Sequence, residues 1–521
     1  MTLTSTAGQA TRHYLSRGRA SPPGEVDWSA APAPHKTYPG ARRVALPWPP
    51  DHHHDRPINR VSALLWDMTG LTRLVWSHPE DPLTGRGTGD PPGQLTCRPA
   101  PSGGALYPIE VYLATGEHAS LPAGLYHYDP AHHCLDLLRD HDHRPALTGL
   151  LNTPPDVIPH LILALAPVWW RNAFKYGEFG YRLMCQETGV LTAQALAVAW
   201  PLGLRAIPHP HYADEPVNRL LGLETFRESV TALLTLSQSA GRAEDCTYQP
   251  RPALSYADLL AQPMATAADP PPSITTLLPV TAALHAASLH LGQPPRTAED
   301  TGAGPSGTCT LSPPGDTRFR IPLPATEAPH LASGITRRAS APAGFHHQPI
   351  SRDALAMILV AADRHHLADL RDAVHLYCLT LDVQDLPPGV FRYDPHDQTL
   401  LPVTGAEALE PAIAGMWAPM TRLALREAAL ALIPVADPET ELDRHGDRRY
   451  RMLQIATGIT VHRAALAAAA LGLGARLHSD ATTDTTDTAL GLTATPWTSQ
   501  TMLLIGTPRT STLDRPTWPR R

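Results

Sequence analysis

The sequence predicts two α+β domains of the same design fused in one chain, and an internal repeat is the main observation behind this prediction. Residues 121–130 (LPAGLYHYDP) return as residues 386–395 (LPPGVFRYDP). Tyr181, which precedes a long Ala- and Leu-rich run, returns in the same relative place as Tyr450. A repeat of this length is too long for a solenoid. We therefore expect a pseudo-symmetric pair of domains, as in a two-fold dimer whose subunits have been joined.

Strands and helices are intermixed within each copy, which is the second observation. Short apolar runs predict strands and longer apolar stretches predict helices. The expected strands are residues 109–114, 161–166, 230–236, 374–381, 430–435 and 502–505, and the expected helices are residues 62–69, 181–200 and 450–471. The last two helices are apolar on most faces, so we expect them to be buried, each against the other copy. This mixture of elements is typical of the α+β or α/β class.

Changes in composition set the expected domain boundaries. Residues 1–34 are rich in Pro, Ser and Ala and are expected to form an irregular arm. The first copy covers residues 35–239, and a proline-rich linker over residues 240–273 leads to the second copy, residues 274–521. Each copy is long enough to bury a hydrophobic core of its own.

Charge and cysteine usage exclude several classes of function. The formal net charge of −7 argues against a protein that neutralises a nucleic-acid backbone. No apolar run is long enough to span a bilayer, and the N-terminus shows no signal-peptide pattern. The 6 cysteines have no CxxC spacing. We expect reduced thiols in a cytoplasmic protein that binds neither nucleic acid nor membrane.

The most specific local pattern is residues 98–108 (RPAPSGGALYP), directly before the expected strand at 109–114. The adjacent Gly103 and Gly104 remove Cβ atoms where a flat ligand could lie against the backbone. Ser102 and the exposed amides could form hydrogen bonds with ring heteroatoms. Taken alone, Pro-Ser-Gly-Gly is more often a tight turn into a strand.

The wider segment resembles the PSxGALYPxExY signature of SagB-type thiazole/oxazole dehydrogenases, within the nitroreductase-like flavoprotein family. The match continues at residues 36–39 (KTYP), 121–128 (LPAGLYHY), 175–182 (KYGEFGYR) and 220–223 (LLGL). It covers nearly all of the first copy and, more faintly, the second. The resemblance implies a nitroreductase-like fold in a tandem pseudo-dimer, with FMN at the interface between the two domains.

The resemblance also implies which residues would hold FMN. In that family one subunit gives the Pro-Ser-x-Gly loop, and the other gives an Arg-Arg-Ser segment and a C-terminal basic residue for the phosphate. The copies divide these parts: the first has Pro101, Ser102, Gly103 and Gly104, and the second has Arg337, Arg338, Ser340 and Arg509. Guanidinium groups suit a phosphate well. The Arg-Arg-Ser segment reads Arg-Arg-Ala-Ser here, which leaves open whether Ser340 replaces the family's serine. The aligned stretch of the second copy, residues 366–373 (HLADLRDA), lacks the loop, so we expect one complete site and one dismantled site.

Lys175 and Tyr176 are the expected catalytic residues, because the resemblance implies that this pair lies beside the flavin and takes the substrate proton. The chain has only two lysines, Lys36 and Lys175. The aligned positions of the second copy hold Arg444 and His445, and an arginine cannot act as a base because its pKa stays above ~12. A lysine base must first lose its proton, which burial and nearby cations favour. Either Lys175 or Tyr176 could be the base.

Two histidine-rich segments are weaker candidates. Residues 52–54 (HHH) lack partner ligands at the spacing of a structural metal site, so we expect a solvated loop and no metal. Residues 209–212 (HPHY) are expected to form a loop after a helix. No GxGxxG follows a strand, so the sequence gives no Rossmann fingerprint for a nicotinamide cosubstrate.

The resemblance implies an FMN-dependent dehydrogenase that oxidises thiazolines or oxazolines of a ribosomal precursor peptide to azoles. A separate cyclodehydratase would make the azoline. The Pro-, Arg- and Ala-rich composition leads us to expect a thiopeptide-type antibiotic pathway. Two alternatives stay open: a nicotinamide-dependent nitro or quinone reductase, and an inactive scaffold that binds the precursor peptide or the cyclodehydratase.

Overall fold

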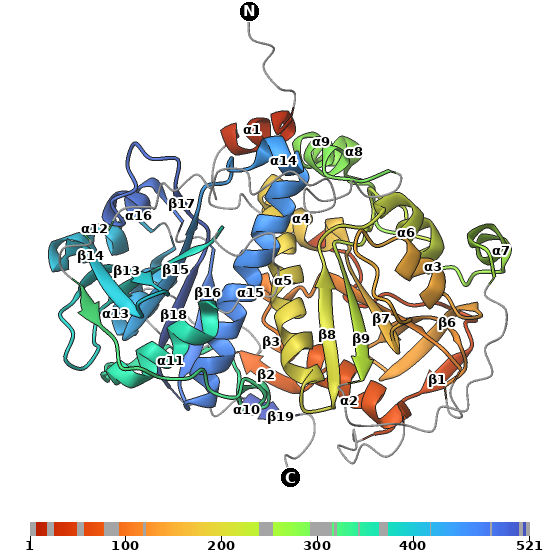
Figure 1. The fold of residues 1–521 in the computed structure, drawn as a ribbon, viewed down its shortest axis with the longest axis horizontal. Helices are drawn as coiled ribbons and strands as arrows, with labels where there is room; N and C mark the ends of the chain where they lie inside the picture. Colours follow the sequence, from red (N-terminus) through yellow and green to blue (C-terminus); the bar gives the residue numbers. More distant parts are fainter. Residues whose placement is uncertain are drawn as a thin grey trace, which may run out of the picture.

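The computed structural model describes residues 7–17, 26–48, 57–77, 93–117, 121–238, 254–291, 315–316, 320–341, 344–363, 373–416, 418–479, 482–509 and 514–516. Two antiparallel sheets lie on either side of a central pair of long helices, and each sheet belongs to one copy of the repeat (Figure 1). This is the tandem α+β arrangement that the repeat predicts.

The first sheet has 7 strands in the order β1-β6-β5-β4-β7-β9-β8. Its strands are β1 (Arg43–Ala45), β4 (Ile109–Thr115), β5 (Gly124–Asp129), β6 (Cys134–Asp140), β7 (Leu161–Pro167), β8 (Leu204–His209) and β9 (Ala232–Gln238). Strands β4 and β7 are buried along their whole length, as their continuous apolar runs predict.

The second sheet repeats this topology. Its path is β10-β14-β13-β12-β15-β18-β11, with β16 and β17 paired to β18 and β15. Its strands are β10 (Ile321–Pro322), β11 (Phe345–His346), β12 (His375–Thr380), β13 (Gly389–Asp394), β14 (Thr399–Gly405), β15 (Leu430–Ala436), β16 (Gly474–His478), β17 (Thr498–Ser499) and β18 (Met502–Pro508). Strands β10, β14, β13, β12, β15, β18 and β16 therefore take the places of β1, β6, β5, β4, β7, β9 and β8. A third, 3-stranded sheet joins β2 (Arg73–Ser77), β3 (Gly93–Cys97) and β19 (Asp514–Pro516).

Helices cover both sheets and fill the space between them. Those of the first half are α1 (Gln9–Ser16), α2 (Pro57–Thr69), α3 (Arg144–Gly149), α4 (Trp169–Tyr176), α5 (Gly180–Ala199), α6 (Asp214–Leu221), α7 (Tyr256–Ala261), α8 (Ile274–Leu277) and α9 (Pro279–Ala287). Those of the second half are α10 (Ala332–Ile335), α11 (Arg352–Asp363), α12 (Leu409–Ala414), α13 (Pro419–Glu427), α14 (Leu442–His445), α15 (Arg448–Ala470) and α16 (Asp484–Ala489). No helix in the described ranges is long and apolar enough to cross a membrane.

The central helices α5 and α15 lie side by side between the sheets (Figure 1). They meet at the two glycines that the repeat shares. A Cβ on Gly189 would collide with the carbonyl of Ile455, and a Cβ on Gly458 would collide with the carbonyl of Gln186. Glycine at both positions therefore allows the two backbones to touch. Almost every residue of α5 and α15 is buried, as their apolar pattern predicts.

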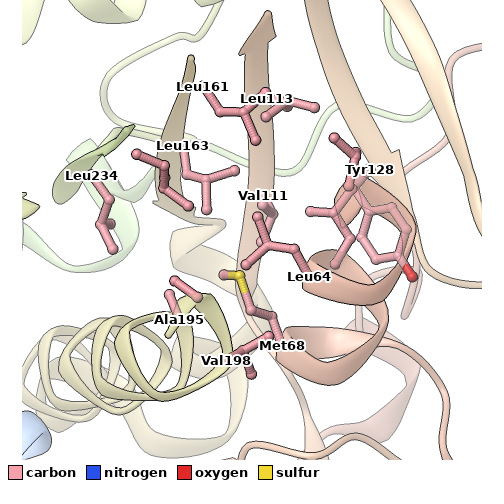
Figure 2. Packing of buried hydrophobic residues seen from close by; sticks show 14 of the residues in the cluster. Leu64, Met68, Val111, Leu113, Tyr128, Leu161, Leu163, Ala195, Val198 and Leu234 are labelled. Carbon is pink, nitrogen blue, oxygen red and sulfur yellow. The ribbon is translucent and has the colours of Figure 1, made fainter. Parts of the chain in front are cut away.

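Each copy packs a hydrophobic core between its sheet and its helices. In the first copy, Leu64 and Met68 of α2 and Val198 of α5 face Val111 and Leu163 on β4 and β7 (Figure 2). All five side chains are buried. This core fixes the start of β4, and it thereby also positions the Pro-Ser-Gly-Gly segment that precedes the strand.

The irregular N-terminal arm is the fold prediction that the structure corrects. Residues 9–16 form helix α1, whose Thr11 amide donates to Asp447 over 2.6 Å and whose Tyr14 packs against Tyr181 and Tyr450. Burial of Tyr14 stabilises a helix that the polar composition of the arm did not predict. The polar contact to Asp447 also joins this arm to the second copy.

Packing also crosses the expected boundary at residue 274. The Ile274 amide donates to the carbonyl of Phe226 over 2.9 Å, and the Thr281 amide donates to Glu178 over 2.7 Å, so α8 and α9 rest on the first copy. At the other end of the chain β19 pairs with β2. The three domain boundaries themselves stay predictions.

Candidate active site

A cavity of about 520 Å³ lies where the two copies meet. The first copy contributes the Pro-Ser-Gly-Gly segment, Tyr176 and one face of α5, and the second copy contributes the turn after α10 and strand β16. The lining residues that the argument uses are Arg73, Pro101, Ser102, Gly103, Gly104, Tyr176, Glu187, Arg338, Ser340, Arg476 and His478. The structure thus brings most of the residues predicted from sequence to one composite cavity.

The Pro-Ser-Gly-Gly segment is held in place by a buried carboxylate. The Ser102 hydroxyl donates to Glu187 over 2.7 Å, and the Gly103 amide donates to Glu187 over 2.9 Å. The Tyr107 amide in turn donates to the Ser102 hydroxyl over 2.8 Å. Ser102 therefore shapes the loop itself, whereas the sequence suggested only a contact with a ligand.

Glu187 was missed at the sequence level. It lies on α5, inside a run that reads as apolar, and it is only 8% exposed. Burial raises its pKa to about 7, and the hydrogen bonds from Ser102 and Gly103 offset part of that rise. The signal that could have found it is the repeat, because the aligned residue of the second copy is Ala456.

Lys175 and Tyr176 end helix α4 directly against the loop. Gly104 has a positive φ of 63°, and a Cβ built on it would lie 2.9 Å from Lys175 Nζ and 3.0 Å from the Tyr176 hydroxyl. Both polar groups therefore face the backbone of the loop. Burial lowers the pKa of Lys175, which is the direction that a lysine base requires.

The N-terminal arm also reaches Lys175. The ammonium group lies 5.5 Å from the ring centre of Trp28 and 5.2 Å from that of Tyr176. Trp28 also packs edge-on against Phe174, while the Trp170 indole donates to the carbonyl of Ala30 over 2.9 Å. The arm thus forms one wall around the lysine.

The four phosphate ligands predicted in the second copy fall into two pairs. Arg338 and Ser340 line the cavity, and Arg338 is buried and donates to the carbonyl of Pro99 in the first copy. Arg337 is exposed and donates to the carbonyl of Ala470, and Arg509 forms an ion pair with Glu427 at 2.8 Å. Neither Arg337 nor Arg509 is among the cavity-lining residues.

The phosphate contacts expected at Arg337 and Arg509 stay a prediction, and in this structure both side chains contact other groups. Arg73 on β2 and Arg476 on β16 line the cavity instead. Neither arginine lies in a sequence motif that points to FMN. Arg476 follows the long helix of the second copy, and the aligned part of the first copy has no cationic motif that would have pointed to it.

The equivalent region of the other half is built differently. Arg448 and Arg451 of α15 both form buried ion pairs with Asp214 of α6, at 2.5 and 2.8 Å. His445, aligned with Tyr176, stacks on His211 with ring centres 5.4 Å apart. Residues 366–372, which replace the loop in this copy, lie outside the described part of the chain. The dismantled second site and the number of cofactors both stay predictions.

The weaker histidine candidates do not form a metal site in the described ranges, where no cluster of three or more His, Cys, Asp or Glu side chains could hold an ion. Residues 52–54 lie outside those ranges. His209 lies at the end of β8, buried, and its Nε2 is 2.9 Å from the Thr235 hydroxyl. Burial lowers the pKa of His209 to about 4.

Comparison with known proteins agrees with this geometry. Residues 335–507 match the model of the nitroreductase family. A crystal structure of a nitroreductase-type protein from Anabaena variabilis ATCC 29413 superposes with a TM-score of 0.71 at 21% identity, over 96% of this chain and 99% of that one. This match shows that the whole tandem arrangement shares that fold.

The chain has a nitroreductase-like fold.

Two curated relatives of this nitroreductase-like protein are named for peptide processing. The microcin B17-processing protein McbC of Escherichia coli is 32% identical over 26% of this chain and 51% of its own length. The trifolitoxin-processing protein TfxB of Rhizobium leguminosarum bv. trifolii is 31% identical over 26% of this chain and 38% of its own length. The matches thus span about half of McbC and less of TfxB. They confirm the resemblance to SagB-type proteins.

Proposed function

We propose that the protein is an FMN-dependent dehydrogenase that oxidises azoline rings of a ribosomally made precursor peptide to azoles. One observation carries the proposal: Lys175 and Tyr176 lie against the Pro-Ser-Gly-Gly loop, and Tyr176 and the loop line a cavity that both copies share. The peptide-processing names of McbC and TfxB support the choice of substrate.

The residues of the cavity fit FMN. Gly103 and Gly104 line the cavity without side chains, and Arg338 and Arg476 supply cationic donors suited to a phosphate. Ser340 adds a hydroxyl from the second copy. FMN, when bound, supplies the acceptor for the two electrons that leave the ring.

The protein's own part in the reaction is to hold the substrate and take its proton. Oxidation of an azoline to an azole removes a hydride equivalent and a proton from the ring. Lys175, whose pKa is lowered by burial, or the adjacent Tyr176 takes that proton. The second copy has Arg444 and His445 at the aligned positions. Arg444 cannot take the proton in place of Lys175, because an arginine keeps its own proton.

The proposed reaction also defines the partners. Azolines form from Cys, Ser or Thr residues of a peptide by loss of water, so a cyclodehydratase must act first and deliver a modified precursor. We place the protein with that machinery in the cytoplasm, in a thiopeptide-type pathway. The 4 cysteines of the described ranges are free thiols, which suits a reducing compartment.

Mass spectrometry of an azoline-bearing peptide incubated with the purified protein tests the proposal. We expect each ring to lose two hydrogens under air without any nicotinamide. A protein that bleaches its flavin anaerobically with NADH or NADPH and leaves the peptide unchanged would instead be a nitro or quinone reductase. A colourless protein that binds the peptide and leaves it unchanged would be a scaffold.

A further inference from the structure

The hydrogen bonds around Ser102 use its only hydrogen. Its hydroxyl accepts from the Tyr107 amide over 2.8 Å and donates to Glu187 over 2.7 Å. An ionised Glu187 can only accept, so it takes hydrogen bonds from both Ser102 and the Gly103 amide. In this state Ser102 offers a cavity ligand no donor.

A proton on Glu187 reverses one of these bonds. One carboxyl oxygen still accepts from the Gly103 amide, and the other, now an O–H, donates to Ser102. The Ser102 hydroxyl then accepts from both Glu187 and Tyr107. Its own hydrogen becomes available to the cavity that Ser102 lines.

We propose that Glu187 is a positioning residue whose proton sets the hydrogen-bond direction of Ser102, so that the cavity binds a ring bearing a hydrogen-bond acceptor together with one proton. The inference depends on the proposed function only for the choice of FMN as that ring. It adds to that function a residue that acts through Ser102 and the loop.

The repeat supports this role independently. The second copy has lost the Pro-Ser-Gly-Gly loop, and the residue aligned with Glu187 is Ala456. The acid and the loop therefore occur together in one copy and are both missing from the other. A buried carboxylate that served only the packing of α5 and α15 would be useful in both helices.

The surroundings of Glu187 suit a group that changes its charge. The positive charge of Arg98 lowers the pKa of Glu187, and Asn172 of α4 donates to its carboxylate over 3.4 Å. Tyr176 also lies close to it: a Cβ built on Gly103 would be 3.2 Å from Glu187 Oε1 and 4.0 Å from the Tyr176 hydroxyl. Behind the loop, a cavity of about 20 Å³ lined by Glu187 and Arg98 has room for one water molecule, which gives the carboxyl group a route for its proton.

Burial raises the pKa of Glu187 to about 7, so its carboxyl group changes charge near neutral pH. Because that value lies above the usual pKa of a glutamate, the folded protein holds the proton more tightly than the unfolded chain. The contribution of Glu187 to stability therefore falls as pH rises from about 4.5 to about 7 and is constant above that.

FMN binding to the flavin-free protein, followed by fluorescence between pH 6 and 8.5, tests the inference. We expect the affinity of the wild type to fall about 3- to 10-fold across this range, the worth of one neutral hydrogen bond. In Glu187→Gln the amide oxygen accepts from Gly103 and the amide nitrogen donates to Ser102. This variant should lack the part of that fall that comes from Glu187. Ser102→Ala should bind more weakly and lack the same part of the fall.

The FMN phosphate also titrates near pH 6, but it does so equally in every variant, so the difference between the wild type and Glu187→Gln isolates the protein group. Glu224→Gln is the matched control, because Glu224 is 71% exposed and forms an ion pair with Arg227 at the surface. Its profile should follow that of the wild type.

Parallel pH profiles for the wild type and Glu187→Gln would overturn the inference. If the wild type binds no FMN at any pH, the proposed cofactor is wrong, and Glu187 is then judged by chemical unfolding of the flavin-free protein. The wild type should lose stability relative to Glu187→Gln between pH 5 and 7. An equal pH dependence of the two unfolding curves would overturn the role of Glu187.

Discussion

The replacement Gly104→Ala tests the contact between the loop and the catalytic pair. An added Cβ would lie 2.9 Å from Lys175 Nζ and 3.0 Å from the Tyr176 hydroxyl, whereas ordinary contacts begin at 3.4 Å. Both groups would have to move by about half an ångström. The residue would also keep a φ of 63°, which costs a non-glycine residue roughly 1–2 kcal/mol.

Misplacement of a catalytic group by 1 Å can cost about 100-fold in rate, so we expect azoline turnover to fall about 10- to 100-fold. The assay is the rate of hydrogen loss from an azoline peptide, with flavin content and unfolding measured on the same sample. Gly472→Ala is the matched control, because Gly472 has a φ of 80° with no atom within 4 Å of an added Cβ. It should show the same strain and full turnover. A Gly104→Ala protein with wild-type turnover would refute the placement of Lys175 and Tyr176 against the loop.

The remaining predictions concern the proton and the phosphate. Tyr176→Phe and Lys175→Ala should keep the fold, and loss of the true base should lower turnover by roughly 10²–10⁴-fold. If Lys175 is the base, Lys175→Arg should be as slow as Lys175→Ala. An active Lys175→Arg protein would leave Tyr176 as the base. If Lys175 is the base, wild-type turnover should rise with pH through a pKa below the usual lysine value, and the rise should vanish in its variants. Arg338→Ala should weaken FMN binding by about 1.5–3 kcal/mol in a fluorescence titration, since it removes a charge-assisted contact. Arg337→Ala and Arg509→Ala should have smaller effects; the reverse order would restore the phosphate contacts expected from the sequence.

The repeat predicted the fold well because both copies carry the same local signals. The expected strands at 109–114 and 430–435 correspond to β4 and β15, and both long helices are buried as expected. Helix α1 was not predicted, because its stability comes from Tyr14 packing on aromatic rings far away in the sequence.

The site was predicted where residues lie in a contiguous motif and missed where packing decides their role. Lys175 and the Pro-Ser-Gly-Gly loop were found from the sequence. Arg337 and Arg338 are neighbours in the sequence, yet only Arg338 turns into the cavity. The ion pair between Arg509 and Glu427 joins segments that are far apart in the sequence, so no local sequence pattern predicts it. Glu187 was overlooked for the same reason, since its partners lie on a different element.

The amount of flavin released per chain tests the composite site most directly. Purified protein should be yellow, and absorbance after denaturation should give about one FMN per chain, because only one half carries the loop and Glu187 together. Two flavins per chain would contradict the dismantled second site, and a preparation that holds no flavin would contradict the cofactor on which the proposed oxidation depends.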